Sequence, residues 1–189
     1  MKVIFLDHDG VICLSQQFGG RFKKQVKVRK KLSQSVMEFH VSCRFDNFDK
    51  KSIKILNQIL EETGAEIVIS SDWRTWATVE EMGEYYEQQG IIKKPIDYTP
   101  SSYPMPEITP WHPVWDLEGS RSLEILEWLK TRPEVTHWVA VDDLNMSWKN
   151  HSEDRSGEGW GLTNFVHTPK VSEGIKQLGI KEKIISFLK

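Results

Sequence analysis

The chain has 189 residues, of which 39% are hydrophobic and 28% charged, and its formal net charge is −2. This length suits one domain with a sizeable core and is short for two, and the near-neutral charge indicates no class of partner. The two cysteines, Cys13 and Cys43, are too few for a disulfide framework and lack metal-ligand spacing. We therefore expect free thiols in a reducing compartment, and a cytoplasmic protein.

The first predicted element is a buried strand, Val3–Leu6, which is followed at once by Asp7, Asp9 and Gly10. The two acids interrupt the apolar run, so it is no signal sequence, and no apolar run approaches the roughly 20 residues of a membrane span. Gly10 permits a sharp turn, which lets both carboxylates reach one centre. Such a pair suits Mg²⁺, or a nucleophile with an acid/base partner, although Asp and Gly are also common in strand-end turns.

Residues 14–45 form a predicted insertion after this motif. It contains the basic stretch 21–31, in which Lys23 and Lys24 are adjacent. One interpretation is a β-hairpin with a solvated cationic face; the other is a flap over the active site that attracts a polyanion and contacts substrate through Lys23 and Lys24. Hydrophobic residues alternate partly with the charges, at Phe22, Val26 and Val28.

A predicted helix begins at its cap Asp49 and ends at Gly64, and a second buried strand, Ile67–Ile69, follows it. The strand leads directly into Ser70-Ser71-Asp72-Trp73-Arg74. A hydroxyl at a strand end can donate to a phosphate oxygen, and Arg74 could add a charge-assisted contact. Ser71 or Asp72 could equally cap the next helix, which would still leave Ser70 available.

That next helix is predicted from about Thr75 to Gln89, with Gly90 at its end. Residues 91–119 are rich in proline and tryptophan, which predicts an ordered loop or small cap. The aromatic residues of the two insertions could stack on nucleic-acid bases, but packing is the usual role of tryptophan. The candidates for stacking are Phe18, Phe22, Trp111 and Trp115.

Ser120 precedes a predicted helix, Arg121–Lys130, and a third strand, His137–Val141, ends in Asp142-Asp143. Adjacent acids at a buried strand end repel each other unless a cation is present or one of them faces solvent. Arg121 could neutralise charge on a transferred phosphoryl group, or could simply lie at the surface. A fourth strand is predicted at Asn164–His167.

The alternation of strands and helices predicts an α/β fold of three layers with a mainly parallel sheet, in a single domain spanning residues 1–189. In such sheets the functional groups gather at the carboxyl ends of the strands. The acids, serines and arginine described above all lie at these predicted positions.

This ordered set resembles the haloacid dehalogenase (HAD) superfamily. The motif Asp-x-Asp-Gly after a hydrophobic strand matches Asp7 to Gly10, the strand-end hydroxyl matches Ser70 or Ser71, the basic helix residue matches Arg121, and the acidic pair matches Asp142-Asp143. The segments Ile69–Arg74, Gly90-Ile91 and Thr99-Pro100 further resemble a subgroup of HAD domains that occur fused to RNA-repair enzymes or as small stand-alone and viral proteins. The long basic insertion departs from that subgroup.

The resemblance implies a Rossmann-like HAD core with small cap or flap insertions. It implies an Mg²⁺-dependent phosphatase in which Asp7 forms an aspartyl-phosphate, Asp9 is the acid/base, and Ser70 and Arg121 assist. An acid at position 9 favours a phosphatase over a dehalogenase, because it can protonate an alkoxide leaving group. The metal would be held by Asp7, the main-chain carbonyl of Asp9, and Asp142 or Asp143.

A nucleotide or a nucleic-acid terminal phosphate is the preferred substrate class, because of the basic stretch. The alternatives are a phosphatase of small metabolites or phosphoproteins, and a non-catalytic nucleic-acid-binding or regulatory module of the same fold. Buried acids that cost several kcal/mol when unpaired argue for the enzyme. We expect no membrane partner.

Overall fold

A five-stranded, entirely parallel sheet with the strand order β3-β2-β1-β4-β5 forms the centre of the computed structural model. The structure describes residues 1–14, 36–101, 115–147 and 161–189. The strands are β1 (Lys2–Leu6), β2 (Glu66–Ile69), β3 (Pro95–Tyr98), β4 (His137–Asp142) and β5 (Phe165–His167). The strand order reverses direction beside β1, which is where open parallel sheets place their ligands.

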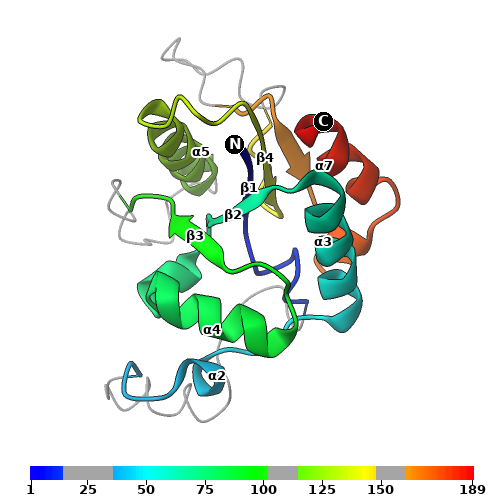
Figure 1. Ribbon diagram of the computed structural model, residues 1–189. Helices are drawn as coiled ribbons and strands as arrows, with labels where there is room; N and C mark the ends of the chain where they lie inside the picture. The colour runs from blue at the N-terminus through cyan, green and yellow to red at the C-terminus, as the bar shows by residue number, and fades with distance from the viewer. Residues whose placement is uncertain (15–35, 102–114, 148–160) are drawn as a thin grey trace.

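Helices cover both faces of this sheet, as Figure 1 shows for α3 and α7 on one side and α5 on the other. The prediction of a three-layer α/β fold is therefore confirmed. The helices are α2 (Val41–Arg44), α3 (Lys50–Thr63), α4 (Val79–Gln89), α5 (Trp115–Lys130) and α7 (Ile180–Leu188), with the 3₁₀ turns η1 (Asp72–Thr75) and η2 (Gly174–Lys176). None of the helices in the described ranges combines the length and hydrophobicity that a membrane span requires.

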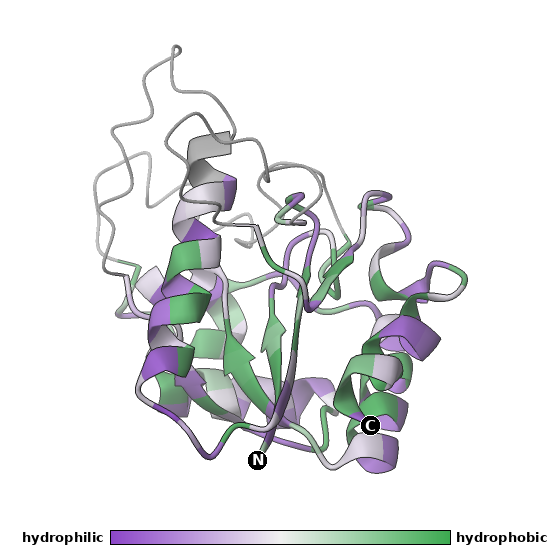
Figure 2. Cartoon of the chain, turned by 90° about the horizontal axis from the view of Figure 1, so that it is seen from above, coloured by the Kyte–Doolittle hydropathy of each residue, from purple (hydrophilic) through white to green (hydrophobic). Residues whose placement is uncertain are grey.

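The central strands β2, β1 and β4 are hydrophobic on both faces, because each face packs against helices. In β1, Ile4 and Leu6 join the core cluster on the α3 and α7 side, while Val3 and Phe5 join the cluster beneath α5. Successive side chains of a strand point to opposite faces of the sheet. Because both faces are buried, all of these residues are hydrophobic and the strand reads as a continuous apolar run. Figure 2 shows the strands as hydrophobic ribbons between the flanking helices.

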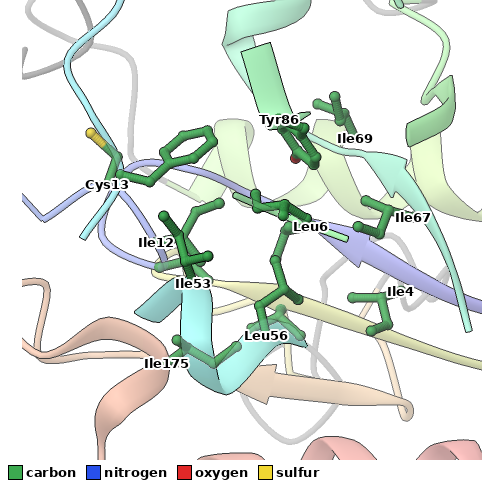
Figure 3. Close-up of a cluster of buried hydrophobic side chains, with 14 of the residues drawn as sticks. Ile4, Leu6, Ile12, Cys13, Ile53, Leu56, Ile67, Ile69, Tyr86 and Ile175 are labelled. Carbon is green, nitrogen blue, oxygen red and sulfur yellow. The ribbon is translucent and has the colours of Figure 1, made fainter. Parts of the chain in front are cut away.

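Leu6 lies in the middle of the larger cluster. In Figure 3 its side chain is surrounded by residues from β2, α3 and α4, among them Ile67, Leu56 and Tyr86. Burial of such residues is the main favourable term in folding, at about 1.5–3 kcal/mol for each large aliphatic side chain. The last residue of β1 before the acidic motif is thus fixed by packing.

Two predicted helix boundaries were placed wrongly. The helix expected from Thr75 begins at Val79, because Thr78 and Glu81 form a capping box there, while residues Asp72–Thr75 form the separate 3₁₀ turn η1. The helix expected from Arg121 begins at Trp115, so Arg121 lies inside α5 and does not open it.

The described ends of the segment 91–119 are more regular than predicted, while residues 102–114 lie outside the described residues. The first end contains the edge strand β3, which pairs in parallel with β2, and the second contributes the first turn of α5. A strand that starts with Pro95 is compatible with an edge position, because proline cannot donate to a neighbouring strand. Its four residues were too short and too polar to be recognised as a strand.

The described end of the predicted insertion, residues 36–45, is part of the core. Val36, Val41 and Phe45 are buried in the larger cluster. The basic stretch 21–31, including Lys23 and Lys24, lies outside the described residues, so the hairpin and flap predictions stay predictions.

Arg44 fastens this segment to α4. Its side chain is buried, and its guanidinium donates to the main-chain oxygens of Phe39, Met37 and Trp76 at 2.7, 3.0 and 2.9 Å. Both terminal nitrogens also reach the Glu81 carboxylate, at 2.8 and 2.5 Å. Main-chain carbonyls and one carboxylate thus satisfy a buried arginine.

Candidate active site

Hydrogen bonds between neighbouring strands bring three predicted site residues to the same edge of the sheet. The Asp7 amide donates to the Val141 oxygen at 3.1 Å, and the Ser70 amide donates to the Leu6 oxygen at 3.0 Å. Asp7 and Ser70 therefore follow β1 and β2 directly, and Asp142 ends β4 on the other side of Asp7. The pairing register of β1 with β2 and β4 therefore positions the two acids and the serine at one edge.

Asp7, Asp142 and Asp143 form a compact acidic cluster. Each offers a carboxylate oxygen, and these three oxygens lie within 4.8 Å of one another. Asp7 and Asp142 are 3% and 1% exposed. Three carboxylate oxygens at the carboxyl ends of parallel strands fit a hard divalent cation such as Mg²⁺, which prefers oxygen ligands and also keeps several waters.

Burial and mutual repulsion shift the protonation of this cluster. Burial, together with the charge of Asp142, raises the pKa of Asp7 well above its ordinary value, against the opposing effect of Arg121. Burial raises the pKa of Asp142 to about 6, and burial with the charge of Asp7 raises the pKa of Asp143 to about 7. A cation in the cluster would reverse this preference, because it favours the charged carboxylates.

Arg121 lies among three carboxylates. Its Nη1 atom is 3.1 Å from Asp7 Oδ1 and 3.0 Å from Asp142 Oδ2, and its Nη2 atom is 3.1 Å from Asp72 Oδ1. The alternative of a surface arginine is excluded, because its side chain is only 11% exposed. Within the described residues, the single positive charge of Arg121 faces these acids and Asp143, so their full ionisation would leave a surplus of negative charge.

Gly10 allows the loop after β1 to pass close to Asp143. Its φ angle is +70°, and a Cβ atom there would lie 2.5 Å from Asp143 Oδ2. A side chain at this position would therefore both strain the backbone and displace an acid of the cluster. The structure explains why a glycine follows Asp9 in the motif.

Asp9 faces the segment that follows β2. Its Oδ2 atom accepts a hydrogen bond of 3.0 Å from the Trp73 indole nitrogen. Asp9 is partly exposed and does not belong to the compact group of Asp7, Asp142 and Asp143. This arrangement is compatible with an Asp9 side chain that works on protons while the other acids hold a cation.

The two strand-end serines share their surroundings. The hydroxyls of Ser70 and Ser71 are both buried, and neither has a hydrogen-bond partner of good geometry among the residues that the structure describes. Ser71 nevertheless lies close enough to Asp7 to help lower the pKa of that carboxyl. Buried hydroxyls usually have a partner, so either serine could donate to an oxygen of a bound molecule, and the choice between them stays open.

The capping alternative for this segment is not observed. Ser71 occupies the position before η1 without a side-chain capping bond, and Thr78 caps the following helix. Asp72 pairs with Arg121 instead.

Arg74 is engaged by the protein itself. Its guanidinium donates to Glu124 at 2.8 Å and to the Thr99 hydroxyl at 2.5 Å, and Glu124 is buried. Burial raises the pKa of Glu124, while the positive charge of Arg74 lowers it. These contacts tie η1 to α5, and a substrate contact by Arg74 stays a prediction.

Three residues that contact the site had no predicted role in it. Trp73, Asp72 and Glu124 contact Asp9, Arg121 and Arg74 respectively. The signal that could have identified the first two is their place directly after the strand-end serines. Glu124 offered the weaker signal of lying one helical turn after Arg121.

Comparison with known protein families identifies a relative of this chain at the family level. A sequence family described as the HAD domain in Swiss Army Knife RNA repair proteins matches residues 3–166, from β1 to β5. No curated protein and no solved structure matches the chain. The match spans the acidic motif, the strand-end serines, Arg121 and Asp142-Asp143, and the chain therefore belongs to this family of HAD domains.

Proposed function

We propose that the protein is an Mg²⁺-dependent phosphatase that forms an aspartyl-phosphate on Asp7, and that its substrate is the terminal phosphate of a nucleotide or nucleic acid. The observation that carries the chemistry is the cluster of Asp7, Asp142 and Asp143 with Arg121 against it. Buried acids at such a distance are costly unless a cation or a reaction uses them. Membership of the HAD family supports the phosphatase class.

In the first step an Asp7 carboxylate oxygen attacks phosphorus. The bond from phosphorus to the leaving oxygen breaks as the new bond forms, and Asp9 gives its proton to the leaving oxygen. In the second step a water molecule gives one proton to Asp9, and its oxygen attacks the same phosphorus. The bond to Asp7 breaks, inorganic phosphate leaves, and both acids return to their starting state.

Arg121 and Ser70 would bind the oxygens of the phosphoryl group. The contact of 3.1 Å between Arg121 Nη1 and Asp7 Oδ1 supports this role, because the positive charge lies beside the carboxylate that we propose as the nucleophile. The carboxylates of Asp7, Asp142 and Asp143, and the main-chain oxygen of Asp9 by family analogy, would hold the metal. A bound Mg²⁺ supplies neutralisation of the charge shared by nucleophile and phosphate.

The decisive experiment measures hydrolysis of p-nitrophenyl phosphate by the purified protein, with Mg²⁺ and with EDTA. We expect turnover that requires the metal and is restored when Mg²⁺ replaces EDTA. A protein without metal-dependent turnover on any of a panel of phosphate monoesters would contradict the proposal. Salt-dependent nucleic-acid binding by that inactive protein would indicate the non-catalytic module instead.

The substrate class is proposed on the family description, which names RNA repair, and on the basic stretch that contains Lys23 and Lys24. A panel of nucleotides, 5′- and 3′-phosphorylated oligonucleotides, small phosphorylated metabolites and phosphopeptides tests it. The double change Lys23→Gln and Lys24→Gln should raise KM for oligonucleotides more at low salt than at high salt, and leave p-nitrophenyl phosphate unaffected. Equal effects on both substrates would contradict a specific contact between the basic stretch and oligonucleotides.

A further inference from the structure

Trp73 connects the segment after β2 to the acidic motif after β1. It is the largest of the fully buried side chains in the described part of the chain, and its indole nitrogen donates to Asp9 Oδ2 at 3.0 Å. Buried tryptophans need a hydrogen-bond acceptor for this N–H, and a main-chain carbonyl would serve. Here the acceptor is the second acid of the motif.

Aromatic neighbours hold the indole on several sides. Phe45 stacks on it with ring centroids 4.3 Å apart and an interplanar angle of 7°, and Phe48 stacks at 5.4 Å. The His8 ring lies 4.5 Å from it, and the His8 Nε2 atom is 2.7 Å from the Tyr86 hydroxyl. The direction of the N–H is therefore set by packing and does not depend on a mobile side chain.

We propose that Trp73 is a positioning residue for Asp9, an inference that rests on the proposed phosphatase function. An indole nitrogen donates one hydrogen and accepts none, so Asp9 Oδ2 must accept. The proton that Asp9 gives to the leaving oxygen is then carried by Oδ1, and the indole fixes the direction in which Oδ1 points. Trp73 does not touch the reacting atoms itself.

This role predicts a dependence on the leaving group. When the bond from phosphorus to an alkoxide breaks, the oxygen needs the proton of Asp9; a nitrophenolate leaves as a stable anion and needs it far less. Loss of the indole N–H should therefore slow the hydrolysis of alkyl phosphates selectively. A purely structural role would slow both substrates equally.

The experiment compares kcat/KM of the wild type and Trp73→Phe for p-nitrophenyl phosphate and a simple alkyl phosphate, with Mg²⁺. The ratio kcat/KM reports the steps up to formation of the phosphoenzyme. We expect a loss on the order of 10–100-fold for the alkyl ester and several-fold less for the nitrophenyl ester. In the Asp9→Asn background the Trp73→Phe change should have almost no further effect on the alkyl ester.

Phe48→Leu is the matched control, because it removes a stacking partner of Trp73 and leaves the N–H in place. We expect it to lower thermal stability while preserving the ratio of the two substrates. If Trp73→Phe fails to fold, incorporation of benzothienylalanine at position 73 keeps the bicyclic shape and replaces the N–H with sulfur.

Equal losses on the two esters, in whichever Trp73 variant folds, would overturn the positioning role while leaving the phosphatase intact. Additive effects of the Trp73 and Asp9 changes would overturn it as well. If the wild type hydrolysed neither ester, the proposed function would fail first, and the inference with it.

Discussion

Two buried arginines, Arg44 and Arg121, show opposite uses of the same side chain. Arg44 donates to three main-chain oxygens and to a single carboxylate, Glu81, so its neighbourhood is electrically balanced. Arg121 pairs, among the residues that the structure describes, with the carboxylates of Asp7, Asp72 and Asp142. The first is a clamp between secondary-structure elements. The second lies in a region where, in the described part of the chain, carboxylates outnumber positive charges.

This difference indicates which region of the molecule contributes mainly to stability and which contributes mainly to activity. Removing a partner from a balanced buried pair leaves an uncompensated charge and destabilises the protein. Removing one acid from a cluster with surplus charge relieves repulsion and should cost little stability. Substitutions in the two regions should therefore affect different measurements.

The largest expected effect is that of Asp7→Asn on activity. We expect turnover of p-nitrophenyl phosphate to fall on the order of 10⁴-fold or more, since the nucleophile is lost. In the metal-free protein the melting temperature should not fall, because the amide oxygen can still accept from Arg121 and a carboxyl whose ionisation is disfavoured beside Asp142 is removed. Glu134→Gln, at an exposed carboxylate, is the control and should change neither quantity. Retained turnover in Asp7→Asn would exclude Asp7 as the nucleophile.

Arg44→Met should have the largest effect on stability. It leaves Glu81 and the main-chain oxygens without their donor, and we expect the free energy of unfolding to fall by about 2–4 kcal/mol. Denaturant titration measures this, and kcat per folded molecule should change little.

Arg132→Met is a matched arginine control for that measurement. Arg132 lies over the Trp128 ring and pairs with Asp97, but both members of that ion pair are substantially exposed. Its replacement should cost only about 1 kcal/mol or less. Equal losses for the two arginines would contradict the description of Arg44 as a buried clamp.

The acidic cluster should make the metal-free protein less stable as the pH rises. Asp142 and Asp143 have pKa values raised to about 6 and about 7, whereas carboxyls in the unfolded chain titrate near about 4. Between about pH 4 and pH 7 the folded state thus holds more protons than the unfolded state, so stability declines as the pH rises. Asp142 alone would contribute about 3 kcal/mol, at about 1.4 kcal/mol for each pKa unit, and the more exposed Asp143 would add a screened share.

Thermal unfolding in EDTA from pH 5 to pH 8 measures this decline. Mg²⁺ should stabilise the protein more at pH 8 than at pH 5, because ligand carboxylates must be deprotonated to bind it. Asp143→Asn should flatten the decline. A melting temperature that rises over this range in EDTA would refute the assignment.

The smallest expected effect is at the start of α4. Thr78→Ala removes the hydroxyl that accepts from the Glu81 amide in the capping box, at a cost of about 1 kcal/mol. Thr75→Ala, at an exposed threonine of η1, should stay within about 0.5 kcal/mol. A larger cost at Thr75 than at Thr78 would show that η1, and not the capping box, fixes this end of α4.

The elements that could be predicted from sequence are those whose signal is local. The strands β1, β2 and β4 are continuous apolar runs because both of their faces are covered, and α3 carries its own signals in the Asp49 cap and Gly64. The edge strand β3 lacks such a run, since only part of it is buried. The start of α5 was missed because tryptophan and proline nearby indicated a loop.

The candidate site divides in the same way. Parallel strands end at one edge, so the meeting of Asp7, Ser70 and Asp142 follows from the predicted sheet alone. The contact of Trp73 with Asp9 could not be predicted, because nothing in a sequence with eight tryptophans tells which indole meets a carboxylate. Nor could the pairing of Arg74 with Glu124, since these residues lie 50 positions apart in the chain and on different elements.

The position of β1 between β2 and β4 has a kinetic consequence. Asp7 and Asp142 come from strands far apart in the chain, and they meet only once the parallel β1–β4 pairing has formed. Long-range parallel pairing forms slowly, because the chain loses loop-closure entropy before the non-local contacts contribute favourable free energy. A cation bound by these acids would then strengthen contacts that few partly folded chains possess, so Mg²⁺ should slow unfolding while leaving the folding rate nearly unchanged.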